Sequence, residues 1–226
     1  MVKIGITVFP GSNCERDVYK VFKTKLKIDT SYIKGNNNVK SFDAIIIPGG
    51  FTYGDRLRAG AIAAHSPLMD NIRDQSDNGI PILGICNGFQ ILVEAGLLPG
   101  ALIPNNSLKF ICKWANIMIT NNKTPFTNLF NEKQIISIPI AHGEGRYMVD
   151  KKSHSLIKEN EQIIMKYYNE NPNGSIDNIA GISNIKGNIL GMMPHPERAS
   201  YKDLVPSGYY NDAITVFKSL VNYISN

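Results

Sequence analysis

Short apolar runs alternate with segments of helical spacing over the first 100 residues, and this alternation limits the possible folds more than any other feature of the sequence. We predict buried strands at residues 3–8, 44–47 and 80–85, and helices at residues 14–26, 57–72 and 88–95. Strands that alternate with helices form a mostly parallel sheet with helices on both faces, so the sequence predicts an α/β fold. In such a sheet, functional residues lie beyond the carboxyl ends of the strands.

The pattern changes at about residue 110, where strand-like runs follow one another with few helices between them. The predicted strands are residues 111–120, 135–140, 147–149, 162–168, 179–182 and 189–193, and a final helix is predicted at residues 211–223. Such a succession favours antiparallel strands added to the sheet, and a small β-subdomain is one form that the addition can take. Because no linker or repeat interrupts the chain, we expect a single domain over residues 1–226.

Composition excludes several classes of protein. With 43% hydrophobic and 19% charged residues, the chain can bury a core and is not largely disordered. The longest apolar runs are only a few residues long, too short for a membrane span or for the apolar region of a signal peptide, so we expect a cytoplasmic protein. The net charge of +5 is scattered rather than gathered into a basic stripe, and no nucleic-acid-binding module is visible.

The three cysteines are Cys14, Cys86 and Cys112, and an odd number excludes a fully paired disulfide framework. Cys86 lies in Gly84-Ile85-Cys86-Asn87-Gly88, between a predicted strand and a predicted helix. This segment has the form G-x-S-x-G, with Cys for Ser, of the sharp turn that raises a nucleophile above a sheet. The start of the helix favours a thiolate there, so Cys86 is the candidate nucleophile. The alternative is an unreactive buried cysteine.

A thiolate that attacks an acyl carbon needs a proton carrier, and His195 is the best candidate among the four histidines. It lies in Met193-Pro194-His195-Pro196-Glu197-Arg198, directly after a predicted buried strand. Prolines on both sides deny a helix, so His195 and Glu197 are expected in extended backbone with their side chains on the same side. Glu197 would then hold the imidazole in one tautomer. Taken alone, this segment is equally typical of a surface loop.

An oxyanion site is the third requirement. Pro48-Gly49-Gly50-Phe51 follows a predicted strand, and such a glycine pair can direct backbone N–H groups into the space above the sheet. We predict an oxyanion hole formed by the N–H groups of Gly50 and of Asn87, the residue after the nucleophile. A plain turn that ends the strand is the alternative.

Together these residues resemble the triad, or class I, glutamine amidotransferases, in which Cys, His and Glu occur in this order and spacing. Gln90 completes the pattern C-x-G-x-Q. Within that family the chain resembles the small-subunit glutaminases of phosphoribosylformylglycinamidine synthase, a resemblance that extends from the first strand to the last helix. It rests on Pro10-Gly11-Ser12-Asn13-Cys14, Pro48-Gly49-Gly50-Phe51-Thr52-Tyr53-Gly54-Asp55, Arg58-Ala59-Gly60-Ala61-Ile62-Ala63, Cys86-Asn87-Gly88-Phe89-Gln90, Ala141-His142-Gly143-Glu144-Gly145-Arg146 and the segment around His195.

The resemblance implies a flavodoxin-like sheet and a two-step reaction, in which Cys86 attacks the side-chain amide of glutamine and His195 first protonates ammonia and then activates water. It also implies that Gln90 lies beside the substrate amide and that the backbone of His142 and Gly143 lies near the amino-acid end. Phe51 is expected to wall the pocket. A structural role for the His142 side chain, and simple packing for Phe51, stay open.

The resemblance further implies partners, because ammonia released without an acceptor is wasted. A large synthetase subunit and a small bridging subunit are expected, and ATP and magnesium would be used by the synthetase. The sequence contains no G-x-x-x-x-G-K-S/T loop, so the ATP site is expected in another chain. We expect neither a cofactor nor a metal ion in this chain. We also expect the isolated chain to be nearly inactive.

Two other classes of function are alternatives. The same fold with Cys, His and Glu can hydrolyse another amide or ester, although a peptidase has no reason to keep Gln90 together with the Gly49-Gly50-Phe51 turn. A binding module that has lost its activity is the second alternative. The presence of Cys86, His195 and Glu197 together argues against a lost activity.

Overall fold

The computed structural model describes residues 2–35, 39–210 and 212–226. In this part of the chain, nine strands form one sheet in the order β2-β1-β3-β4-β11-β10-β9-β6-β7. They are β1 (Lys3–Val8), β2 (Asp29–Lys34), β3 (Ala44–Ile47), β4 (Ile82–Ile85), β6 (Ile111–Ile119), β7 (Ile135–His142), β9 (Ile163–Tyr167), β10 (Ile179–Ser183) and β11 (Ile189–Met192). A second sheet pairs β5 (Ala101–Ile103) with β8 (Arg146–Met148).

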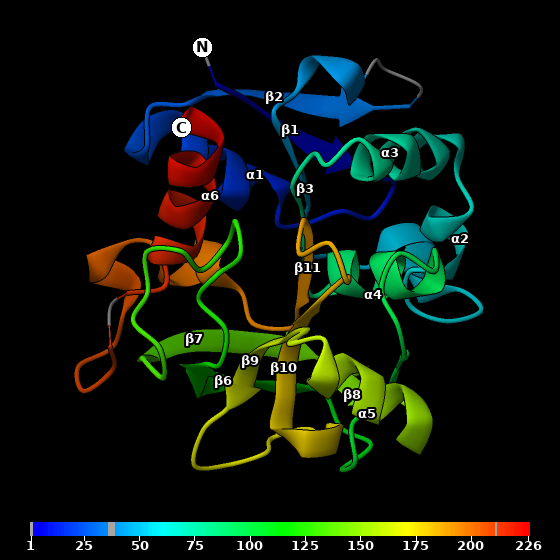
Figure 1. The fold of residues 1–226 in the computed structure, drawn as a ribbon, viewed down its shortest axis with the longest axis vertical. Helices are drawn as coiled ribbons and strands as arrows, with labels where there is room; N and C mark the ends of the chain where they lie inside the picture. Colours follow the sequence, from blue (N-terminus) through cyan, green and yellow to red (C-terminus); the bar gives the residue numbers. More distant parts are fainter. Residues whose placement is uncertain (1, 36–38, 211) are drawn as a thin grey trace.

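The helices are α1 (Glu15–Lys20), α2 (Ala61–Ala64), α3 (Pro67–Asp77), α4 (Asn87–Glu94), α5 (Lys151–Glu159) and α6 (Thr215–Ser225). Figure 1 shows α1 and α6 on one side of β3 and β11, and α2, α3 and α4 on the other. Every residue of β3, β4 and β11 is buried, as expected for strands that are covered on both faces. Within the described residues, no helix has the length and apolar character required to cross a bilayer.

The sheet confirms the predicted α/β class and corrects its details. Strands β2, β1, β3, β4 and β11 run parallel to one another, whereas the pairs β11–β10, β10–β9, β9–β6 and β6–β7 are antiparallel. The prediction that grouped β11 with the antiparallel strands is correct only for its pairing with β10, because on its other side β11 pairs parallel with β4 from Ile189 and Ile82 to Met192 and Ile85. Strands β10, β9, β6 and β7 continue the main sheet, so they do not build the separate subdomain that we considered. Of the strands predicted in this half, β8 alone lies in the two-stranded sheet with β5.

Several elements escape prediction because their apolar pattern is weak. Strand β2 lies at the edge of the sheet and buries only two of its six residues, Thr30 and Ile33. Helix α5 buries only Ile157, and its start is marked by Asp150, whose carboxylate accepts hydrogen bonds from two backbone N–H groups. The single helix predicted at residues 57–72 is wrong, because the chain forms α2 and α3 there. The predicted start of the last helix, Asn211, lies outside the described residues.

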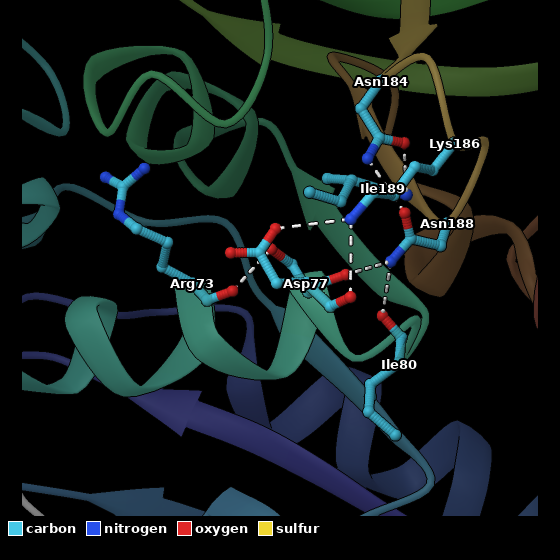
Figure 2. Close-up of polar contacts among 8 residues, drawn as sticks. Arg73, Asp77, Ile80, Asn184, Lys186, Asn188 and Ile189 are labelled. Carbon is cyan, nitrogen blue, oxygen red and sulfur yellow. Dashed lines mark hydrogen bonds and ion pairs between the residues drawn. The ribbon is translucent and has the colours of Figure 1, made fainter.

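The hairpin between β10 and β11 is fastened to the end of α3 by side-chain amides (Figure 2). Asn188 donates hydrogen bonds to the carbonyl oxygens of Ser76 at 2.8 Å and Ile80 at 3.2 Å. Asn184 accepts from the N–H of Ile189 at 3.0 Å and donates to the side chain of Asn188 at 2.8 Å. These bonds fix the beginning of β11 beside the beginning of β4, and therefore also fix the segments that extend beyond the carboxyl ends of both strands.

Candidate active site

Cys86 lies between the end of β4 and the first residue of α4, in a backbone conformation that side chains rarely adopt, with φ +51° and ψ −104°. Its N–H donates to the carbonyl oxygen of Met192 at 2.8 Å, and its sulfur lies 3.6 Å from the carbonyl oxygen of Ala141. A strained residue that surrounding structure holds in place is a feature of functional sites. This geometry is that of the sharp turn expected from the sequence.

The glycines on either side of Cys86 are required by close packing. A methyl group on Gly84 would lie 2.6 Å from the carbonyl oxygen of Gly88. A methyl group on Gly88 would overlap the carbonyl oxygen of Ile47 in the neighbouring strand β3. Only glycine allows the start of α4 to cross this close to the sheet.

His195 and Glu197 follow β11, the neighbour of β4. The N–H of His195 donates to the carbonyl oxygen of Pro139 at 2.8 Å, which fixes the backbone against β7. The Nδ1 atom of His195 lies 2.6 Å from Oε1 of Glu197, and both side chains are almost fully buried. The predicted extended backbone is wrong, because residues Pro196–Ala199 form a 3₁₀ turn that nevertheless brings the two side chains together.

The electrostatics of the cluster favour a protonated His195. Burial alone would lower the pKa of His195, but the carboxylate of Glu197 and the sulfurs of Cys86 and Cys14 outweigh this effect and raise it well above 6.5. His142 behaves in the opposite way, since burial and the neighbouring His195 lower its pKa to about 4. One histidine can therefore hold a proton at neutral pH beside Cys86, while the other stays neutral.

Of the two predicted oxyanion donors, Gly50 lines the same cavity as Cys86, and Asn87 directly follows Cys86 in the chain. Ser12 and Gly50 form a bridge whose two hydrogen bonds are donated by Asn13 and Phe51, so this bridge does not use the N–H of Gly50. Asn87 is the first residue of α4, where backbone N–H groups have no acceptor within the helix. The side chain of Asn87 is oriented by the N–H of Thr52, which donates to its oxygen at 3.1 Å.

A cavity of about 130 Å³ opens in front of the Cys86 sulfur. Gln90 is held at its wall, because its amide nitrogen donates to the carbonyl oxygen of Glu144 at 2.7 Å and its amide oxygen accepts from Asn87 at 2.8 Å. The rings of Phe51 and Phe110 stand 6.4 Å apart at this site. The lining residues are Gly50, Phe51, Asp55, Cys86, Gln90, Phe110, Ala141, His142, Gly143 and Glu144.

Four of the lining residues were not among the predicted site residues: Asp55, Phe110, Ala141 and Glu144. Asp55 accepts a hydrogen bond from the side chain of Asn87 at 3.3 Å, and burial and the charge of Glu144 raise its pKa to about 6. Asp55 and Glu144 both lie inside sequence segments that carry the family resemblance, so the resemblance could have indicated them as site residues. The pattern did not show that both carboxylates reach the same cavity.

A group of metal-ligating atoms also occurs beside the cavity. The ligand atoms of Cys14, His195 and Glu197 lie within 4.8 Å of one another. His195 and Glu197 are already hydrogen bonded, and the guanidinium of Arg198 donates to the sulfur of Cys14 at 3.1 Å. A resident cation would have to displace these contacts and approach Arg198, so the arrangement fits a polar cluster better than a metal site.

Comparisons with known proteins agree with this geometry. The model of the CobB/CobQ-like glutamine amidotransferase domain matches residues 1–224. Phosphoribosylformylglycinamidine synthase subunit PurQ of Moorella thermoacetica is 50% identical over 208 residues, covering 88% of this chain and 88% of that protein. A chain of the PurLQS structure from Thermotoga maritima is 43% identical, with a TM-score of 0.88 and 99% of both chains covered.

A more distant structure shares the fold alone. A glutamine amidotransferase from Thermotoga maritima superposes with a TM-score of 0.61 at 14% identity, covering 100% of this chain and 99% of that chain. The chain therefore belongs to the glutamine amidotransferase family, and within it to the family of phosphoribosylformylglycinamidine synthase subunit PurQ.

Proposed function

We propose that this chain is the glutaminase subunit of phosphoribosylformylglycinamidine synthase, in which Cys86 hydrolyses glutamine and the ammonia passes to an ATP-dependent synthetase for de novo purine biosynthesis. One observation carries the proposal above all others. The strained Cys86 borders a small cavity, and the buried pair of His195 and Glu197 follows the adjacent parallel strand.

The chemistry follows from the charges in the site. Because His195 holds a proton beside Cys86, the sulfur attacks the side-chain carbonyl of glutamine as a thiolate. The N–H groups of Gly50 and Asn87 stabilise the oxyanion that forms. When this intermediate collapses, the C–N bond breaks, His195 gives its proton to the departing ammonia, and a glutamyl thioester remains. His195 then takes a proton from water, which attacks the thioester and releases glutamate.

The cavity wall fits a free amino acid as substrate. Asp55 and Glu144 are the ionisable carboxylates in the lining and suit the positive α-ammonium group, while Gly143, which lines the same cavity, suits the α-carboxylate end. Gln90 faces the substrate amide and Phe51 walls the aliphatic part, with His142 contributing backbone. This orientation directs the side-chain amide towards Cys86.

The partners are part of the proposal. A large synthetase subunit binds ATP and magnesium, and a small bridging subunit completes the complex. The PurLQS structure that this chain matches supports such an assembly. We place the reaction in the cytoplasm, and we take residues 1–226 as one domain, which the continuous nine-stranded sheet supports.

The test is release of glutamate from glutamine, measured for the wild type and for Cys86→Ala, each with and without the two partner subunits, ADP and formylglycinamide ribonucleotide. We expect release that requires Cys86 and rises sharply with the partners. Cys112→Ala is the matched control, because Cys112 is exposed on β6. Absence of release under every condition, together with a Cys86 that resists a glutamine-like alkylating agent, would contradict the proposal.

A further inference from the structure

A second cysteine touches the catalytic histidine and has no part in the reaction above. Cys14 precedes α1, is 2% exposed, and has its N–H bound to the carbonyl oxygen of Gly49 at 3.1 Å. Its sulfur lies 3.9 Å from Nδ1 of His195, the same atom that binds Glu197. Gly49 closes the other side, because a methyl group there would lie 2.7 Å from the His195 ring and 3.2 Å from the Cys14 sulfur.

The sulfur of Cys14 accepts a hydrogen bond from Arg198. Nη2 of Arg198 donates to it at 3.1 Å, and since a guanidinium has donors only, the sulfur accepts. Nε of the same guanidinium lies 3.9 Å from Oε1 of Glu197, which is too long for a hydrogen bond. That carboxylate oxygen is the one that His195 uses at 2.6 Å.

These distances show that Arg198 has two possible acceptors, the sulfur of Cys14 and Oε1 of Glu197, and that it binds the sulfur. A guanidinium prefers a carboxylate, which it binds at about 2.7–2.9 Å when nothing holds it elsewhere. If Arg198 moved onto Oε1 of Glu197, it would weaken the bond that orients His195 and would bring a positive charge towards the imidazolium. We infer that Cys14 is a positioning residue that holds Arg198 away from Glu197, so that Glu197 stays committed to His195.

The inference rests on the proposed function and adds a residue to it. The ionisable groups that face His195 are Cys14 before α1, Cys86 after β4, His142 on β7, and Glu197 and Arg198 after β11. With its pKa of about 4, His142 is neutral over the working range of pH. Removing the Cys14 sulfur therefore acts on His195 in two ways, since it removes the direct contact of the sulfur with the imidazole and frees Arg198 to approach Glu197.

The experiment compares Cys14→Ala, Cys14→Ser and the double variant Cys14→Ala with Arg198→Met. Cys14→Ala is expected to lower kcat for glutamine about tenfold, with KM unchanged because Cys14 does not line the cavity. Cys14→Ser keeps an acceptor for Arg198 and should stay within about threefold of the wild type. The double variant should recover most of the loss, because the competing guanidinium is gone.

A readout that does not depend on turnover is the titration of His195 by NMR with labelled histidine, assigned with His195→Gln. We expect Cys14→Ala to lower the pKa of His195 by about one unit. The double variant should reverse the part of this shift that the freed Arg198 causes, while the part due to the lost sulfur contact stays. If the wild type releases no glutamate, the proposed function fails while this titration still tests the role of Cys14.

Two results would overturn the inference. One is a folded Cys14→Ala variant whose kcat and His195 titration equal those of the wild type. The other is a double variant no better than Cys14→Ala, since loss of activity would then come from something other than Arg198. Should Cys14→Ala fail to fold, Cys14→Val fills a similar buried volume without an acceptor and is read in the same way.

Discussion

At the residue scale, Asp55 shows how a group in the site can oppose stability. Burial and the charge of Glu144 raise its pKa in the folded chain to about 6, above the ordinary value of 3.8. Between about pH 4 and pH 6 the folded chain binds more protons than the unfolded chain, so stability falls as pH rises through this window. Above about pH 6 Asp55 is ionised in both states, and its full destabilising effect on the folded chain is present.

Asp55→Asn should therefore be more stable than the wild type at pH 8 by about 1 kcal/mol, a value reduced from the full shift because the side chain is partly exposed and screened. The gain should shrink as pH falls from 6 towards 4. Urea unfolding at several pH values measures it, and Asp77→Asn on the exposed end of α3 controls for the substitution. A gain that does not change with pH would contradict this prediction. The same variant should raise KM for glutamine.

Residue patterns predicted Cys86 from the glycines two residues before and after it at the end of an apolar run. They predicted His195 and Glu197 from the prolines beside them after the next such run. They did not predict the role of Asp55, which lies in a turn where Tyr53, Gly54 and Asp55 all have positive φ. Such a turn has no hydrophobic periodicity, so the local sequence does not indicate the direction of the Asp55 carboxylate. The role of Cys14 is hidden for a related reason, because its neighbours come from a segment about 180 residues away.

At the element scale, the placement of β11 decides whether His195 meets Cys86. Strand periodicity located the run 189–193 but not its partner, because four buried residues look the same in a parallel or an antiparallel pair. What selects β4 is the hairpin turn and its amide bonds to the end of α3 (Figure 2), and such long-range contacts are absent from the local pattern. Elements with many buried apolar residues were predicted well, and those with few, such as β2, were not.

Asn188→Ala should lower the free energy of unfolding by about 2 kcal/mol, because two hydrogen bonds to the carbonyl oxygens of Ser76 and Ile80 are lost in a buried place, and Ser76 keeps only the N–H of Gly79 as donor. Lys186→Ala, in the same turn, should change it by less than about 0.5 kcal/mol, since its ion pair with Asp77 is exposed. Denaturant midpoints measure both. Equal effects of the two variants would show that the amide bonds do not fasten the hairpin.

At the scale of the whole molecule, the two ends of the chain pack together. Helix α6 lies beside α1 in Figure 1, and Phe217 of α6 meets Phe22, which directly follows α1, with ring centroids 5.0 Å apart in an edge contact. Both rings are fully buried. The C-terminal helix therefore completes the core that the first strand and helix begin.

Phe217→Ala should cost about 3–5 kcal/mol of stability, because a buried aromatic ring is replaced by a cavity. Tyr223→Ala in the same helix should change stability by less than about 0.5 kcal/mol, as its side chain is 52% exposed. Thermal unfolding followed by circular dichroism measures both. A small effect of Phe217→Ala would mean that α6 is not part of the cooperative core.

The parallel pairing of β4 with β11 also has a consequence for synthesis on the ribosome. About a hundred residues separate these strands, and at about 5–20 residues per second their emergence differs by roughly 5–20 s. During that interval the nascent chain already contains the cysteine, but its histidine has not been made. Until β11 emerges, one edge of the apolar strand β4 stays unpaired. An unpaired apolar strand edge is the kind of surface that chaperones cover. The enzyme therefore acquires its reactivity and covers this apolar strand edge in the same late step.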